Sequence, residues 1–221
     1  MIADNYKRFM NDPTILRFVE RNGRVFIATE GRSAELIAAL YRLGHRFFSE
    51  KYVQESAMKW SRLKAEYPDV TINFFGSSQR NKLRKLVRLF DVIESVDRPS
   101  VAHVLRRILN EESPASMRYF LVQLNVGREP QKRGVSPEGA QDLIDLCLDL
   151  GLPLRGLMAI PPQSEDPAPH YQRLRRLADL NGLAECHMGM SGDFRKAIEA
   201  GATAIRVGQA IFTNTGAWGE P

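Results

Sequence analysis

The sequence predicts an α/β fold, a single-domain (β/α)8 barrel of the TIM type, and three observations support that fold class. Strand-like and helix-like segments alternate along nearly the whole chain, without a linker, and the strand-like segments number eight. A chain of 221 residues, 43% of them hydrophobic, can bury one sizeable core. Such alternation is typical of a parallel sheet covered by helices. An open, doubly wound sheet remains the alternative, because periodicity does not report whether a sheet closes.

The predicted strands are short apolar runs. Continuous apolar runs are expected for barrel strands, because parallel strands are buried on both faces. In chain order they cover 25–29, 45–50, 71–76, 92–96, 119–126, 154–160, 186–190 and 204–212. We expect one barrel domain over 1–221, in which 1–24 is a short N-terminal helical segment and 213–221 a short tail.

Amphipathic helices with recognisable ends are predicted between the strands. Ser33 can cap one helix, which Gly44 closes. Ser136 supplies a second N-cap, followed by Pro137 in the first turn. A third helix is expected to begin at Ser191, directly after the seventh strand.

Charge and composition argue against several classes of protein. The net charge is +5, and much of the excess lies in 80–88, where basic and apolar residues alternate. This alternation favours a solvated helix face over a nucleic-acid surface. No apolar stretch reaches the roughly 18 residues of a membrane span, and the N-terminus has no secretory pattern. Cys147 and Cys186 lie in apolar contexts without metal-ligand spacing, so we expect buried thiols, no metal site and a cytoplasmic protein.

A phosphate site is suggested by the residues that follow the last two predicted strands. Ser191 and the first amides of its helix offer hydrogen-bond donors to an anion. The backbone of Gly208 can approach a ligand closely, and the amides of Gly208 and Gln209 add donors. In barrels of this type, the loops after strands seven and eight often bind phosphate. A serine that merely caps a helix is the alternative.

The same region resembles the C-terminal signature of the YggS/PROSC family of pyridoxal phosphate homeostasis proteins, which are related to the barrel domain of alanine racemase. The resemblance is carried, colinearly from about residue 25 to 212, by 52–55, 75–82, 95–98, 154–161, 187–193 and 206–212. It implies a pyridoxal 5′-phosphate site at the barrel mouth. The residues implied to bind the cofactor are Asn81, Met190, Ser191, Arg206, Gly208 and Gln209, with Arg206 facing the pyridine nitrogen.

The chain departs from the family at the Schiff-base lysine. The family has alanine-valine-serine-lysine at the end of strand one, where this chain reads Ile27-Ala28-Thr29-Glu30, and the spacing to 52–55 has no gap. Glutamate cannot condense with an aldehyde, so the covalent link of the family is lost at this position. Lys51, after the second strand, is predicted either to form a salt bridge with Glu30 or to approach the vacated space and form the Schiff base itself.

Other departures lie near the mouth, and together they lead to a functional prediction. Asn73 replaces a frequent histidine, and His187 replaces a small residue, so that His187 is a candidate for ligand contact. We predict a monomer that binds pyridoxal phosphate, or a related phosphorylated small molecule, non-covalently, with a role in homeostasis or regulation. One alternative is an enzyme that uses Glu30 and Lys51 as an acid–base pair. Another is a pseudoenzyme that acts through protein contacts at 80–88, and racemase activity is not expected.

Overall fold

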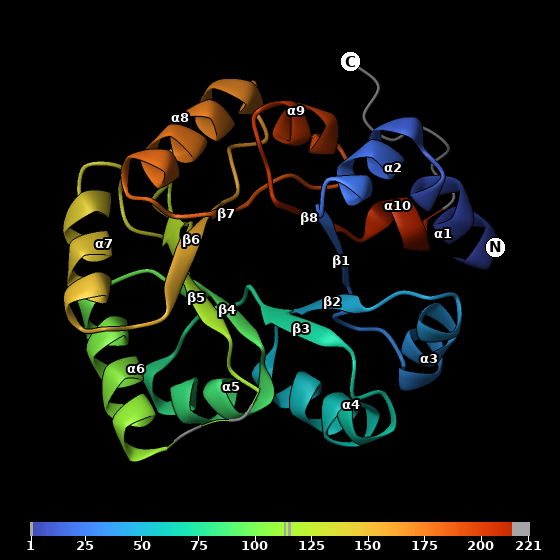
Figure 1. The fold of residues 1–221 in the computed structure, drawn as a ribbon, viewed down its shortest axis with the longest axis horizontal. Coiled ribbons are helices and arrows are strands. Elements are labelled where there is room, and N and C mark those ends of the chain that lie inside the picture. Colours follow the sequence, from blue (N-terminus) through green and yellow to red (C-terminus); the bar gives the residue numbers. More distant parts are fainter. Residues whose placement is uncertain (1, 113, 115, 214–221) are drawn as a thin grey trace.

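The computed structural model of the chain, which describes residues 2–112, 114 and 116–213, is a closed eight-stranded parallel barrel surrounded by helices (Figure 1). Neighbouring strands pair in chain order, and β8 closes the sheet by pairing with β1 in parallel. The predicted barrel is confirmed, and the open-sheet alternative is wrong. The strands are β1 (Arg24–Ala28), β2 (Phe47–Glu50), β3 (Thr71–Phe74), β4 (Val92–Val96), β5 (Tyr119–Leu124), β6 (Leu154–Ala159), β7 (Glu185–His187) and β8 (Ala204–Val207).

Most strands are shorter than predicted, and the eighth differs most. The apolar run 204–212 divides at Gly208 into β8 and a short helix. Both halves are apolar because the strand and the helix each bury side chains, which is why the run alone did not reveal the break. The predicted tail lies outside the described residues from 214 onward.

Helices cover the outside of the barrel (Figure 1). Two of them precede β1, and one α-helix follows each strand. A short 3-10 helix, η1, also lies between β3 and α5. Their bounds are α1 (Ile2–Met10), α2 (Pro13–Glu20), α3 (Ala34–Arg42), α4 (Val53–Glu66), η1 (Arg80–Lys82), α5 (Leu83–Leu89), α6 (Pro99–Glu111), α7 (Ala140–Asp149), α8 (Pro167–Leu180), α9 (Phe194–Glu199) and α10 (Gln209–Phe212).

One of the three predicted helix starts is confirmed. Ser33 caps α3 by accepting a hydrogen bond from the amide of Leu36. Ser136 is not a helix cap, because its hydroxyl accepts from the Gly139 amide within a turn that delays α7 to Ala140. Ser191 does not begin α9 either, and its hydroxyl is engaged elsewhere, as described below.

The main core lies between the sheet and the helices, and the barrel interior is partly polar. Large side chains such as Trp60, Phe9 and Phe194 are fully buried in the outer core, which supplies the hydrophobic stabilisation of the fold. Inside the barrel, a smaller apolar cluster contains Leu121 and Met158, and buried polar side chains lie beside it.

Gly156 allows β6 and β7 to approach closely, and this gives a stability prediction. A Cβ at position 156 would lie 2.0 Å from the carbonyl oxygen of Glu185, so the two strands would have to separate. We expect Gly156→Ala to lower the free energy of unfolding by about 1–3 kcal/mol or more, as overpacking does. Urea unfolding measures this. Gly192→Ala is the matched control, because a Cβ there meets nothing within 4 Å, and an equal loss in both variants would contradict the explanation.

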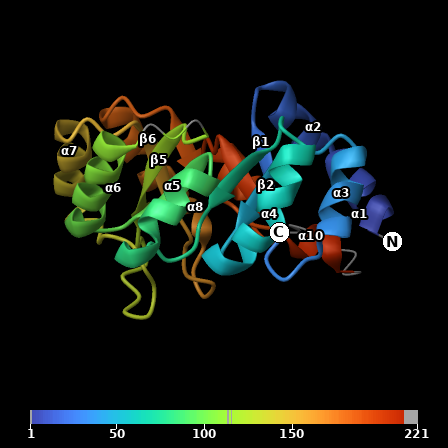
Figure 2. The same ribbon diagram turned by 90° about the horizontal axis from the view of Figure 1, so that it is seen from below.

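The carboxyl ends of the parallel strands share one face of the barrel, which positions the site. The loops that follow β5 and β6 both project from this face, along the lower edge of Figure 2. In barrels of this type, the chemistry lies on the C-terminal face. Within the part of the chain that is described, no helix has both the length and the apolar character that crossing a membrane requires.

Candidate functional site

A pocket of about 540 Å³ opens at the C-terminal mouth of the barrel. It brings together five of the six predicted cofactor-binding residues: Met190, Ser191, Arg206, Gly208 and Gln209. Glu30, in the turn that follows β1, lines the same pocket. The sixth residue, Asn81, is exposed on η1 and does not line it, because the 3-10 turn after β3 carries its side chain outward.

Ser191 lies against the first turn of α10 and not at the start of α9. Its hydroxyl accepts hydrogen bonds from the amides of Gly208, at 3.4 Å, and Ala210, at 3.2 Å. The N-cap position of α9 belongs to Asp193, whose carboxylate accepts from the amide of Met190 at 2.6 Å. The backbone donors and the hydroxyl therefore converge at the pocket wall. Because the oxygen of Ser191 accepts from these amides, its hydroxyl proton remains to donate to an anionic oxygen in the pocket.

Arg206 reaches the pocket from β8 and is held from two sides. One guanidinium nitrogen donates to Glu94, and the guanidinium carbon lies 4.0 Å from the ring centroid of Phe75. Its Nε atom is buried and has no hydrogen-bond partner. A buried donor without an acceptor is costly, so Nε would gain from an acceptor atom supplied by a ligand.

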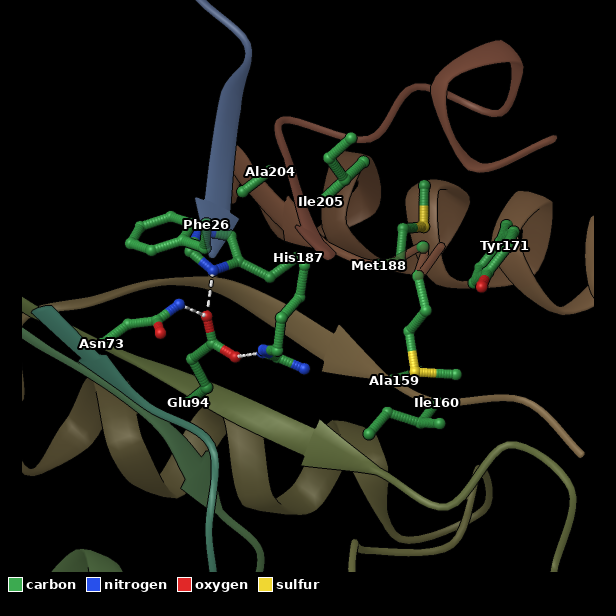
Figure 3. A pocket seen from close by; sticks show the side chains of 13 residues that line it. Phe26, Asn73, Glu94, Ala159, Ile160, Tyr171, His187, Met188, Ala204 and Ile205 are labelled. Atoms are coloured by element: carbon green, nitrogen blue, oxygen red, sulfur yellow. Dashed lines mark hydrogen bonds and ion pairs between the residues drawn. The ribbon is translucent and has the colours of Figure 1, made fainter. Parts of the chain in front are cut away.

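Below the mouth, Glu94 is the centre of a buried polar cluster (Figure 3). Asn73, His187 and Arg206 all donate to its carboxylate. Burial opposes the charge of Glu94, but Arg206 and His187 outweigh it and lower the pKa of the carboxyl. Glu94 was not among the residues predicted from the sequence. The available signal was a lone acid in the middle of the short, otherwise uncharged run Val92–Val96, which is predicted to be a strand.

The cluster continues toward the opposite end of the barrel. The second ring nitrogen of His187 lies 3.7 Å from the carboxylate of Glu185, an ion-pair distance too long for a hydrogen bond. Glu185 in turn pairs with Arg24. Burial lowers the pKa of His187, but the carboxylates of Glu94 and Glu185 outweigh it, so the net shift is upward. His187 is therefore an interior residue of the cluster, and the gap beside it holds only about 10 Å³, roughly one water molecule.

The predicted salt bridge between Glu30 and Lys51 is wrong. Among the described residues, Oε2 of Glu30 is buried and has no hydrogen-bond partner. Lys51 is exposed, and its nearest aromatic contact places Nζ 5.7 Å from the ring centroid of Tyr52. Glu50, the last residue of β2, faces helix α4, where Trp60 and Lys59 contact it, and Lys51 lies just past the strand with an exposed side chain.

The backbone on each side of Glu30 is held by helix α4. Lys59 donates to the carbonyl oxygen of Thr29 at 2.7 Å, and Glu55 accepts from the amide of Gly31 at 2.7 Å. Gly31 has a φ of +68°, a conformation that favours glycine. These contacts hold the turn, so that the carboxylate of Glu30 lies at the pocket wall.

Lys59 is also occupied by ion pairs. Its ammonium lies 2.9 Å from Glu50 and 2.7 Å from Glu55. Glu50 is fully buried and accepts further hydrogen bonds from Thr29 and Trp60. Lys59 therefore serves to fix the ends of β1 and β2.

The basic stretch 80–88 is partly neutralised by α6. Arg84 pairs with Glu111 and Glu112, and Arg88 pairs with Glu112. These pairs reduce the positive charge that α5 presents. Among the described residues, no group of three or more His, Cys, Asp or Glu side chains is arranged to hold a metal ion.

Comparisons with known proteins identify relatives of this chain. No family model matches the chain. A pyridoxal phosphate homeostasis protein of Vibrio alginolyticus is 34% identical over 202 residues, which cover 86% of this chain and 85% of that protein. Another, of Pseudomonas aeruginosa, is 40% identical over 191 residues, which cover 82% and 80%.

Solved structures show the same architecture. The structure of PipY from Synechococcus elongatus with PLP bound is 29% identical, with a TM-score of 0.76, over 96% of this chain and all of that one. The same protein without PLP has a TM-score of 0.83. An alanine racemase of Clostridium difficile, 12% identical with a TM-score of 0.71, shares the fold, and this chain spans 57% of its length.

Proposed function

The chain belongs to the family of pyridoxal phosphate homeostasis proteins, and from this premise we propose that it binds pyridoxal 5′-phosphate, or a related phosphorylated small molecule, non-covalently. Its role is in cofactor homeostasis or regulation rather than catalysis. The observation that carries the proposal is the mouth pocket, in which Ser191, Gly208, Gln209 and Arg206 line one cavity.

The donors of the pocket fit the two ends of the cofactor. The Ser191 hydroxyl accepts from the amides of Gly208 and Ala210, so its own proton is directed away from them and suits a phosphate oxygen, and Gly208 and Gln209 line the same pocket. The unpartnered Nε of Arg206 suits an acceptor such as an unprotonated pyridine nitrogen. When bound, the cofactor can act as an electron sink, and a cation at its ring nitrogen weakens that property. Arg206 therefore favours storage or delivery of the cofactor.

The lysines near the mouth support non-covalent binding. Glu30 occupies the position of the family's Schiff-base lysine and has no amine. Lys59 is engaged by Glu50 and Glu55, and Lys196, which lines the pocket, pairs with Asp166. Lys51 is exposed. Treatment with pyridoxal phosphate and borohydride, followed by peptide mapping, tests the substitute role of Lys51, which a labelled Lys51 peptide would favour.

Ser191 should contribute strongly to phosphate binding. We expect Ser191→Ala to weaken the binding of pyridoxal 5′-phosphate about tenfold or more, because hydrogen bonds to charged groups contribute roughly 1.5–3 kcal/mol. Equilibrium dialysis measures the affinity. Ser61→Ala, which removes an exposed hydroxyl on α4, is the control and should bind normally. Equal affinity of both variants would remove Ser191 from the site, and failure of the unmodified protein to bind any pyridoxal species would reject the proposed function.

Composition and cysteine usage support a proposal for the assembly and location of the protein. We propose one barrel domain over 1–221, which works as a monomer in the cytoplasm. Cys147 and Cys186 are free thiols, which suits a reducing compartment. Burial raises the pKa of each thiol to about 12, so neither is reactive. Light scattering in solution tests the monomer.

A further inference from the structure

Glu30 stands out among the charged side chains that line the mouth pocket. Asp193 accepts from Tyr171 and Met190, Glu165 pairs with His170, and Lys196 pairs with Asp166. Arg206 pairs with Glu94. Of the described residues in this lining, Glu30 is the charged one without a partner.

The carboxylate of Glu30 is poorly placed to find a partner within the protein. Helix α4 holds the backbone on both sides of it, through Thr29 and Gly31. Its Oε2 atom is buried without a hydrogen bond. A buried acceptor of this kind costs free energy in the empty pocket. That cost is recovered when a ligand brings a hydrogen-bond donor to the same place.

The chemistry of a carboxylate determines which ligands fit. An ionised carboxylate only accepts hydrogen bonds, and an ammonium only donates them. An aldehyde oxygen is an acceptor, so beside Glu30 it would leave two acceptors facing each other. A primary ammonium would instead form a charge-assisted hydrogen bond, which is the stronger kind.

We propose that the mouth pocket selects the amine form of its ligand, a phosphorylated compound whose primary ammonium binds Glu30 while its phosphate binds Ser191 and the neighbouring amides. Among the vitamin B6 phosphates, that compound is pyridoxamine 5′-phosphate. The inference rests on the proposed function and deepens it. Glu30 is the residue that determines specificity, and the phosphate donors contribute equally to every form.

Calorimetric titration of the protein with three phosphates tests the selection. Pyridoxamine 5′-phosphate is expected to bind at least about tenfold more tightly than pyridoxal 5′-phosphate, with pyridoxine 5′-phosphate between them, because its neutral hydroxyl donates a single weaker hydrogen bond. Glu30→Gln keeps the shape of the side chain and should reduce the preference to less than about threefold. Glu35→Gln removes an exposed acid of the neighbouring helix α3 and should keep it.

A second variant, Glu30→Lys, tests the ligand preference independently of Glu30→Gln. Glu30→Lys should reverse the preference, since its ammonium repels the amine and condenses with the aldehyde to give a visible Schiff-base absorption. Equal binding of the three phosphates by the unmodified protein, or a preference for the amine that survives in Glu30→Gln or Glu30→Lys, would overturn the selection and leave the proposed function intact. Absence of binding by all three would overturn both.

Discussion

Glu94→Gln is expected to lower the free energy of unfolding by about 3–5 kcal/mol, the usual cost of removing one partner of a buried ion pair. The side chain of Glu94 is fully buried, and it accepts from Arg206, His187 and Asn73. An amide of the same shape cannot balance the charge of Arg206 or of a protonated His187. Arg206 would remain without its counter-charge, and His187 would keep only the more distant carboxylate of Glu185, at 3.7 Å.

Urea unfolding measures this loss, and an exposed acid is the control. Glu111 pairs with Arg84 at the protein surface. Glu111→Gln should therefore change stability by no more than about 0.5 kcal/mol, because exposed ion pairs contribute little. A loss below about 1 kcal/mol in Glu94→Gln would show that the cluster is not held by the charge of Glu94.

The barrel could be predicted because its signal is local and repeated. Apolar runs, helical periodicity and cap residues such as Ser33 each report on a few neighbouring residues, and they agree along the chain. Strand ends were predicted less well, because an apolar run does not say whether it is buried as strand or helix. Ala210 and Ile211 illustrate this, since both are buried but belong to α10 and not to β8.

The residues of the pocket could be located from the sequence, whereas those of the interior cluster could not. Ser191, Gly208 and Arg206 lie in one continuous stretch with a recognisable pattern, so the sequence located them. The partners of Glu94 come from β3, β7 and β8, and their contacts depend on which strand residues point into the barrel. Glu30 and Lys51 were wrongly paired for the same reason, since proximity of two strand ends does not fix the direction of their side chains.

His45 is expected to make the protein less stable in acid. It is buried before β2, where its Nε2 atom lies 2.7 Å from the carbonyl oxygen of Phe47 and its Nδ1 atom lies 3.4 Å from the hydroxyl of Tyr6. A neutral ring that carries its proton on Nε2 can donate to the first and accept from the second. The pKa of His45 is lowered from 6.5 to about 4, chiefly by burial and to a smaller extent by the charge of Arg46, while the hydrogen bond to the Phe47 carbonyl opposes the shift.

A lowered histidine pKa makes the folded state less stable as the pH falls. Between pH 6.5 and about 4, His45 is protonated in the unfolded chain but neutral in the folded protein. The contribution of His45 to the free energy of unfolding is therefore complete above pH 6.5 and is lost as the pH falls toward 4. One tenfold change in acidity corresponds to about 1.4 kcal/mol, which makes the loss roughly 3 kcal/mol. His187 acts in the opposite direction, because its raised pKa stabilises the fold below pH 6.5 and that contribution is lost as the pH rises through its folded value.

Urea unfolding of the protein and of His45→Gln, at pH 7 and at pH 4.5, separates the effect of His45 on stability from that of His187. Glutamine does not titrate, so the variant should lose less stability than the parent protein between these pH values, by about 2–3 kcal/mol. His103→Gln, which removes an exposed histidine from α6, should follow the parent protein at both pH values. If His45→Gln also followed the parent protein, His45 would not be buried in its neutral form, and the acid sensitivity would have to come from the carboxylates of the Glu94 cluster.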